Sequence, residues 1–306
     1  MPARESPEPA PAPADYSGVL PVPGVSALAA TYDGLILDQW GVLHDGTRPY
    51  AGAIECLERL RAAGKRVVVL SNSGRREAEN LRFMARMGFP ETLFDRFVSA
   101  GDEARRAIAE RVDPFHRALG RRCYAFTREG DHSLIEGIGL EIVDRIEAAD
   151  FIAVIGTDSP RRNLPDYEAQ LQAGIRLRLP MICTNPDLVR LSPQGAIEAP
   201  GVLSRRYEAL GGTVFYHGKP HPAIYGTCLE ALAVASRDRV LAIGDSIEHD
   251  VLGAARAGLR SAFIAGGIHA EELMTIWGKC PSPQAWRAFA VKAVARPDYL
   301  LPAFIW

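Results

Sequence analysis

The sequence lacks three features that would point to particular classes of protein. Its 306 residues include only five cysteines, and none of them forms a C-x-x-C pair, which argues against a zinc knuckle or a thioredoxin-type site and is typical of reduced thiols in a cytoplasmic protein. No apolar run approaches the roughly 18 residues of a membrane span, and the N-terminus has no apolar signal core. The 35 basic and 37 acidic residues give a net charge of -2, so the chain has no basic excess for binding nucleic acid.

Hydrophobic residues make up 47% of the chain, which is enough for a sizeable core. Residues 1–15 are rich in proline and alanine and predict a disordered tail. Beyond them, short apolar runs alternate with amphipathic segments, the pattern of a parallel sheet with helices on both faces. The expected strands of this first set are Leu35–Leu37, Val67–Leu70, Val214–Tyr216, Val240–Ile243 and Ser261–Ile264, and the expected helices are Ala53–Ala63 and Arg76–Met87.

A second set of the same kind lies between residues 100 and 205. Its expected strands are Cys123–Phe126, Phe151–Ile155 and Pro180–Cys183, and its expected helices lie at Leu134–Ile138 and Asn163–Ile175. The sequence therefore predicts an α/β fold in which one α/β unit is inserted into another. Residues 270–306 are expected to add a helix after Ala270 and a second helix at Gln284–Val294, packed on the first unit.

Polar residues stand where expected strands of the first set end. In a parallel sheet the carboxyl ends of the strands meet at one edge, so these residues are expected to share one crevice. A carboxylate nucleophile, hydroxyl and amide groups, a lysine and further acids suit phosphoryl transfer, with magnesium held by the carboxylates. The residues are Asp38, Ser71-Asn72-Ser73, Gly218-Lys219-Pro220 and Gly244-Asp245.

These motifs, taken in order, resemble the haloacid dehalogenase (HAD) superfamily. The resemblance rests on Asp38–Leu43, Leu70–Ser73, Gly218–Pro220 and the G-D-x-x-x-x-D pattern of Gly244–Asp250. The run Thr184-Asn185-Pro186-Asp187, with Gly195 and Pro200-Gly201, resembles its subclass IIA, which contains NagD-like and phosphoglycolate or pyridoxal-phosphate phosphatase-like proteins. The resemblance implies a Rossmann-like core at residues 16–99 and 206–269, an inserted α/β cap at 100–205, and a C-terminal helical extension at 270–306.

The resemblance also implies a role for each matching residue. Asp38 would be the nucleophile, forming an aspartyl-phosphate, and Lys219 would hold the charges of the nucleophile and phosphate together. Magnesium would be bound by Asp38, the backbone carbonyl of Trp40 and Asp245, with Asp250 acting behind them or through a water molecule. The phosphate and the rest of the substrate would contact Trp40, Ser71, Asn72, Ser73, Asn185, Asp187 and Lys219. The expected substrate is a small phosphorylated metabolite, and members of the subclass often pair through their caps, which suggests a homodimer by analogy alone.

One residue departs from the family pattern. Phosphatases of the family have D-x-D at the first motif, whose second aspartate protonates the leaving oxygen and later activates water, whereas this chain has Asp38-Gln39-Trp40. Losing a general acid and base costs about 10²–10⁴ in rate. The nearby His44 and Asp45 are weak candidates to replace it, because the NagD-like pattern carries similar residues after an intact D-x-D.

Three interpretations remain open at this point. The first is a magnesium-dependent phosphatase that is slow or restricted to good leaving groups such as acyl phosphates. The second is a degraded protein that still binds phosphate or a metabolite. The third is a 2-haloacid dehalogenase, because those enzymes carry an aromatic residue at the position of Trp40 and halide leaves without a proton; the acidic pattern of Asp245 and Asp250 speaks against it, since dehalogenation needs no metal.

Overall fold

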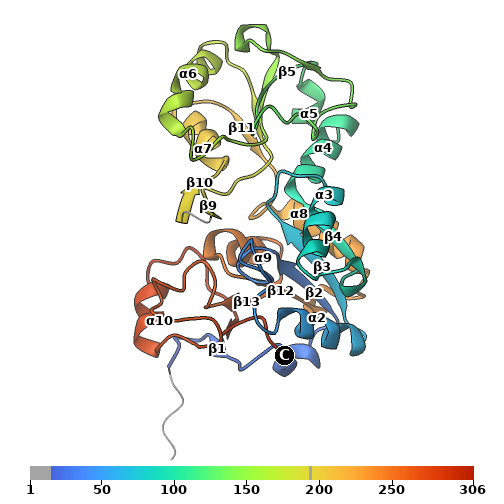
Figure 1. Cartoon of the computed structure of the whole chain (residues 1–306), viewed down its shortest axis with the longest axis vertical. Helices are drawn as coiled ribbons and strands as arrows, with labels where there is room; N and C mark the ends of the chain where they lie inside the picture. Colours follow the sequence, from blue (N-terminus) through green and yellow to red (C-terminus); the bar gives the residue numbers. More distant parts are fainter. Residues whose placement is uncertain (1–14, 193–194) are drawn as a thin grey trace, which may run out of the picture.

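Two parallel sheets, one below the other in Figure 1, form the two halves of the molecule. The computed structural model describes residues 15–192 and 195–306. The tail predicted at the N-terminus lies outside the described residues, except for Asp15. No helix in the described part of the chain is long and apolar enough to cross a membrane.

The larger sheet has seven parallel strands in the order β1-β14-β13-β12-β2-β3-β4. The inner strands β13, β12, β2 and β3 contain apolar runs that the sequence predicted, whereas β14 was not predicted, and the strand residues alternate between the two faces. Leu35 and Leu37 belong to one core cluster and Ile36 to the other. The strands are β1 (Leu20–Pro21), β2 (Gly34–Asp38), β3 (Arg66–Ser71), β4 (Arg96–Ser99), β12 (Val240–Gly244), β13 (Arg260–Ile264) and β14 (Tyr299–Leu301).

Helices cover both faces of this sheet. The helix α2 (Ala53–Ala62) buries Ala53, Cys56, Leu57 and Leu60, which share one helical face and pack in the same cluster as Leu35. Burying each leucine contributes about 1.5–3 kcal/mol. The helices α1 (Ser26–Ala29) and α3 (Glu77–Arg86) lie on this side, and α8 (Pro222–Leu232) and α9 (Leu252–Arg256) pack on the opposite face.

The smaller sheet has five parallel strands in the order β11-β8-β7-β5-β6. The three predicted strands of the second set are present in it. An antiparallel pair, β9 (Val189–Ser192) and β10 (Gly195–Glu198), projects from the smaller half toward the lower half (Figure 1). The strands of the smaller sheet are β5 (Arg122–Phe126), β6 (Glu141–Ile142), β7 (Phe151–Val154), β8 (Met181–Cys183) and β11 (Val214–Tyr216). The helices of this half are α4 (Ala100–Glu110), α5 (Pro114–Ala118), α6 (Glu168–Arg176) and α7 (Gly201–Ala209).

The strand β11 belongs to the smaller sheet, although the sequence analysis grouped it with the first set. It pairs with β8 from Val214 to Tyr216, and α7 packs in the core of the smaller half. The smaller half therefore continues past residue 205 and returns to the larger sheet only after Tyr216. An apolar run of three residues can join either sheet, and its periodicity does not distinguish between them.

Two predicted helices are absent. Leu134 and Ile135 are buried, but residues 131–139 form turns, because Gly137 and Gly139 adopt positive φ values of 71° and 76° that an α-helix does not allow. The segment after Ala270 also consists of turns. The second helix of the extension is α10 (Pro283–Ala290), which ends earlier than predicted, and the extension then adds β14 to the larger sheet.

Candidate active site

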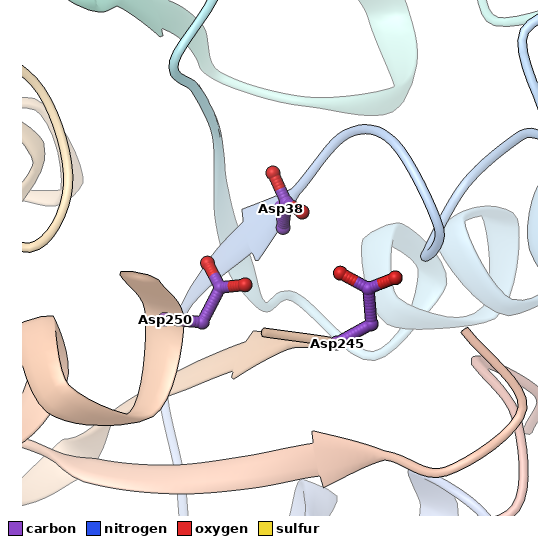
Figure 2. A group of neighbouring side chains, drawn as sticks. All are labelled: Asp38, Asp245 and Asp250. Atoms are coloured by element: carbon purple, nitrogen blue, oxygen red, sulfur yellow. The ribbon is translucent and has the colours of Figure 1, made fainter. Parts of the chain in front are cut away.

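Three aspartates meet at the carboxyl edge of the larger sheet. Asp38 is the last residue of β2, Asp245 directly follows β12, and Asp250 lies in the π-helical turn Ile247–Val251. One carboxylate oxygen from each lies within 4.8 Å of the others, and Figure 2 shows the three side chains directed toward a common point. The structure thus brings together Asp38 and Asp245, which the sequence placed at strand ends, and Asp250, which the family motif implied.

Glycines allow these carboxylates to lie close to the backbone. A Cβ atom at Gly41 or Gly267 would overlap the carboxylate of Asp245, and one at Gly244 would overlap Asp250. Gly41 also has a φ of 77°, which favours glycine. The glycines of the first and last motifs are therefore required by the acidic cluster itself.

Lys219 lies between two of the acids. Its Nζ donates to Asp38 Oδ1 at 2.6 Å and to Asp250 Oδ1 at 2.7 Å, and its side chain is only 3% exposed. Although burial alone would lower it, the carboxylates of Asp250 and Asp38 raise the pKa of Lys219 well above its usual value. The lysine is therefore a fixed positive charge that orients the Asp38 carboxylate.

One ammonium does not balance three carboxylates. Burial, and then the charge of Asp250, raises the pKa of Asp38 to about 7 despite Lys219. Burial, together with Asp38 and Asp250, also raises the pKa of Asp245 well above its usual value. A cluster of buried oxygen donors with excess negative charge is the donor set that magnesium prefers.

The loop after β3 is held by Asn72. Its Oδ1 accepts from the backbone N of Lys219 at 2.7 Å, and its Nδ2 donates to the Lys219 carbonyl at 3.2 Å and to Asp187 Oδ1 at 2.7 Å. In the same loop the Ser73 N–H donates to Ser71 Oγ at 3.2 Å, and Ser71 is buried. Asn72 thus fixes the position of Lys219 and contacts the smaller half at the same time.

The two polar residues predicted on the cap have different positions. Asp187 reaches the larger half, where it accepts from Asn72 and lies 3.6 Å from His249 Nε2. Asn185 stays within its own loop, where its Oδ1 accepts from the Asp187 N–H at 3.0 Å. His249 did not emerge from the sequence as a contact of the cap, because the pairing depends on how the two halves meet.

Trp40 is held by an aromatic cluster. Its side chain is 37% exposed, its ring stacks against Phe83 at 6.1 Å between centroids, and it meets His44 edge-on at 4.9 Å. Gly46 lies so close to the indole that a Cβ there would overlap it. The sequence analysis did not identify Phe83, because its position on α3 does not indicate that it stacks on Trp40.

Neither proposed substitute for the missing aspartate is placed as an acid or base. His44 is fully buried, its Nδ1 accepts from the Gly46 N–H at 3.0 Å, and burial lowers its pKa to about 4. The Asp45 carboxylate accepts hydrogen bonds from Thr47 and Arg48 in the turn that follows it. Although desolvation would raise it, these hydrogen bonds lower the pKa of Asp45 to about 2. The structure uses His44 to support Trp40 and Asp45 to close a turn.

A buried polar chain holds the segment that precedes Lys219. Glu103 Oε2 accepts from the Gly218 N–H at 3.0 Å and lies 3.6 Å from His217 Nδ1. His217 Nε2 lies 3.1 Å from His116 Nε2, and the other ring nitrogen of His116, Nδ1, lies 2.7 Å from Asp113 Oδ2. The helix α4 leads into the smaller half, and Gly218 follows β11, the strand that leads out of it. These hydrogen bonds and close contacts therefore connect the two segments that link the halves, next to the site.

Comparison with known proteins agrees with this architecture. Residues 35–141 match the family model described as haloacid dehalogenase-like hydrolase, and residues 216–285 match the model described as HAD-hydrolase-like. A solved structure of a haloacid dehalogenase-like hydrolase from Brucella suis has 32% sequence identity and a TM-score of 0.78, covering 92% of this chain and 99% of that one. The chain belongs to the haloacid dehalogenase-like hydrolases.

Two curated relatives narrow the class. Ribonucleotide monophosphatase NagD from Escherichia coli is 29% identical over 246 residues, which are 78% of this chain and 89% of that protein. D-glycerol 3-phosphate phosphatase from Mycobacterium tuberculosis is 26% identical over 277 residues, 90% of this chain and 71% of that protein. The NagD relationship agrees with subclass IIA, the group that the Thr184–Asp187 motif resembles.

Proposed function

We propose that this protein is a magnesium-dependent phosphatase that cleaves small phosphorylated metabolites through Asp38. The observation that carries the proposal is the position of Lys219, whose Nζ bonds Asp38 and Asp250 next to Asp245. Such a cluster favours phosphoryl transfer over dehalogenation, because carbon–halogen cleavage has no use for three acids around one point. Both curated relatives are phosphatases by name.

The residues fit a divalent cation. Asp38, Asp245 and Asp250 would hold it, together with the backbone carbonyl of Trp40, and Gly41 and Gly267 leave room for the carboxylates. When bound, the cation neutralises oxygens of the phosphoryl group as charge develops on them. Lys219 holds the Asp38 carboxylate in one orientation, so that the oxygen not bonded to the lysine is free to attack.

In the first step an Asp38 oxygen forms a bond to phosphorus while the bond from phosphorus to the leaving oxygen breaks. Ser71 and the backbone amides near Asn72 would hold the phosphoryl oxygens. The leaving oxygen takes its proton from water, because the Trp40 indole N–H is too weak an acid to provide one. In the second step water attacks the same phosphorus, releases phosphate and restores the Asp38 carboxylate.

This chemistry restricts the substrates. The leaving group of an acyl or aryl phosphate is a carboxylate or phenolate, a stable anion that needs no acid, whereas that of an alkyl phosphate is a strongly basic alkoxide. We therefore expect acyl and aryl phosphates to react faster than alkyl phosphates by about 10²–10⁴, the rate factor that general acid catalysis would otherwise contribute.

The test is phosphate release from a panel of acyl, aryl and alkyl phosphates. We expect turnover with magnesium, none after EDTA, and none in Asp38→Asn, while the control Asp144→Asn, an exposed acid of the smaller half, keeps full activity. No turnover of any substrate, with inorganic phosphate still bound, would support the non-catalytic binder instead.

A further inference from the structure

Three arginines lie beside the site, and the chemistry above does not use them. Arg75 follows the Ser71–Ser73 loop of the larger half, Arg128 follows β5, and Arg190 lies on β9. We propose that they form a second anion subsite, which binds a carboxylate or a second phosphate group of the substrate. The inference rests on the proposed function, because it describes the part of the substrate that is not transferred.

One backbone segment, residues 155–159 after β7, connects the three arginines. A Cβ at Gly74, next to Arg75, would lie 2.7 Å from the Ile155 carbonyl oxygen. A Cβ at Gly156 would lie 2.9 Å from the backbone N of Arg128. Arg190 Nη2 donates to the Ser159 carbonyl at 2.9 Å. Arg190 therefore contacts this short loop directly, and the backbone at Gly74 and Arg128 lies against it, although the three arginines come from both halves of the molecule.

None of the three guanidinium groups forms an ion pair among residues 15–192 and 195–306, whereas Arg76 and Arg161 pair with Asp102 and Glu129. Besides burial, the charges of Arg128 and Arg75 lower the pKa of Arg190, as expected for like charges in close proximity. Asp131 is near enough for Arg75 to contribute to lowering its pKa, after the hydrogen bonds from Ser133.

The cluster adjoins the groups that would hold the phosphate. The same Cβ at Gly74 would lie 3.3 Å from Thr184 Oγ1, which begins the loop that carries Asp187. Asp187 accepts from Asn72, and Asn72 in turn bonds the backbone of Lys219. These contacts connect the loop that contains Arg75 with the loop of Asp187 and, through Asn72, with Lys219.

The chemistry of the guanidinium group specifies the ligand. Arginine presents a planar fork of N–H donors that matches the two oxygens of a carboxylate or a phosphate, and a bound anion offsets the repulsion among the three cations. A neutral group of the same shape offers no such compensation. The subsite is thus expected to distinguish anionic from neutral substrates rather than large from small ones.

The test compares three phenyl phosphates that differ only at the para position, which carries a carboxylate, a second phosphate or a neutral carboxamide. Binding is measured by calorimetry to the full chain carrying Asp38→Asn, so that the ligand persists whether or not the parent turns it over. Binding is then compared with that of a double variant that also carries Arg128→Met. Arg128 is chosen because its side chain is exposed and makes no hydrogen bond in the described residues. The control is Arg145→Met, an exposed arginine of the same half that pairs with the exposed Glu147.

We expect the carboxylate or the bisphosphate to bind about tenfold more tightly than the carboxamide, and Arg128→Met to remove most of that preference without affecting carboxamide binding. Which of the two anions is preferred shows whether the subsite takes a carboxylate or a phosphate. Equal binding of all three ligands, no binding, or a preference that Arg128→Met leaves intact overturns the subsite. Turnover of the carboxamide by the parent protein separately tests the proposed function, so the two failures are distinguishable.

Discussion

Asn72 Nδ2 donates to Asp187 Oδ1 at 2.7 Å, which joins the loop after β3 to a loop of the smaller half. The same Asn72 side chain bonds both backbone groups of Lys219. The contact between the two halves is therefore coupled directly to the residue that bonds Asp38, the proposed nucleophile.

Replacing Asp187 by alanine tests this coupling. The change removes a charged acceptor from Asn72 and from the neighbourhood of His249, so the asparagine is no longer fixed from the cap side. We expect kcat/KM for an aryl phosphate to fall about tenfold, the value of one hydrogen bond to a charged group. Asp187→Asn, which keeps an acceptor oxygen, should recover part of the activity. Equal activity of the alanine variant and the parent would show that the contact has no role in catalysis.

Trp40→Asp tests the account of the missing acid. The new carboxyl group can protonate the leaving oxygen, so we expect the rate for an alkyl phosphate to rise at least about tenfold relative to that for an aryl phosphate. Trp40→Phe is the matched control, since it can still stack on Phe83 but provides no acid. Rates for both substrates are measured under conditions where thermal unfolding shows each variant to be folded. A fall in both rates with Trp40→Asp would show that the indole has a role of its own.

Glu103 tests the buried chain behind Lys219. Glu103→Leu leaves the Gly218 N–H and His217 without their acceptor, and we expect kcat to fall about tenfold while KM changes little, because Lys219 is displaced rather than lost. Glu103→Gln keeps an oxygen for Gly218 and should retain most of the activity. Glu110→Leu on the same helix, where the side chain is 59% exposed, is the control for helix stability. A leucine variant as active as this control would remove Glu103 from the positioning of Lys219.

His44 predicts an acid-sensitive contribution to stability. Its folded-state pKa, about 4, lies below its usual value of 6.5, so the unfolded chain binds more protons between these two pH values. The free energy of unfolding should therefore fall as pH decreases from 6.5 to 4, by about 3 kcal/mol from this residue. Urea unfolding of the parent and of His44→Gln at several pH values measures the difference, which isolates His44 from other groups. A parallel pH dependence in the two proteins would contradict the assignment.

Much of the site could be predicted because its residues occur at the ends of apolar strands. Asp38 ends β2 and Asp245 directly follows β12, and these strands are neighbours in the sheet, so the topology rule for parallel strands was enough to place the two acids together. The contacts of Phe83 and Glu103 could not be predicted in the same way. Each depends on where a helix face meets a segment that is distant in sequence, and local patterns contain no information about that register.

The incorrect predictions have equally local causes. The apolar residues Leu134 and Ile135 suggested a helix, but Gly137 and Gly139 adopt positive φ values that an α-helix does not allow. The short run of β11 was grouped with the wrong sheet because three apolar residues fit either one. Arg75 could be considered from the sequence as a residue that attracts an anionic substrate, but its grouping with Arg128 and Arg190 could not, since the three come from separate elements that meet at the loop after β7.

The central claim is that Asp38 accepts the phosphoryl group while Trp40 leaves the second step without a base. Intact-mass and peptide mass spectrometry after rapid acid quenching of the magnesium-loaded protein with an aryl phosphate tests this directly. We expect a mass increase of one phosphoryl group on Asp38 that accumulates during turnover and decreases in Trp40→Asp. No covalent phosphate during measurable turnover, or phosphate on another residue, would contradict it.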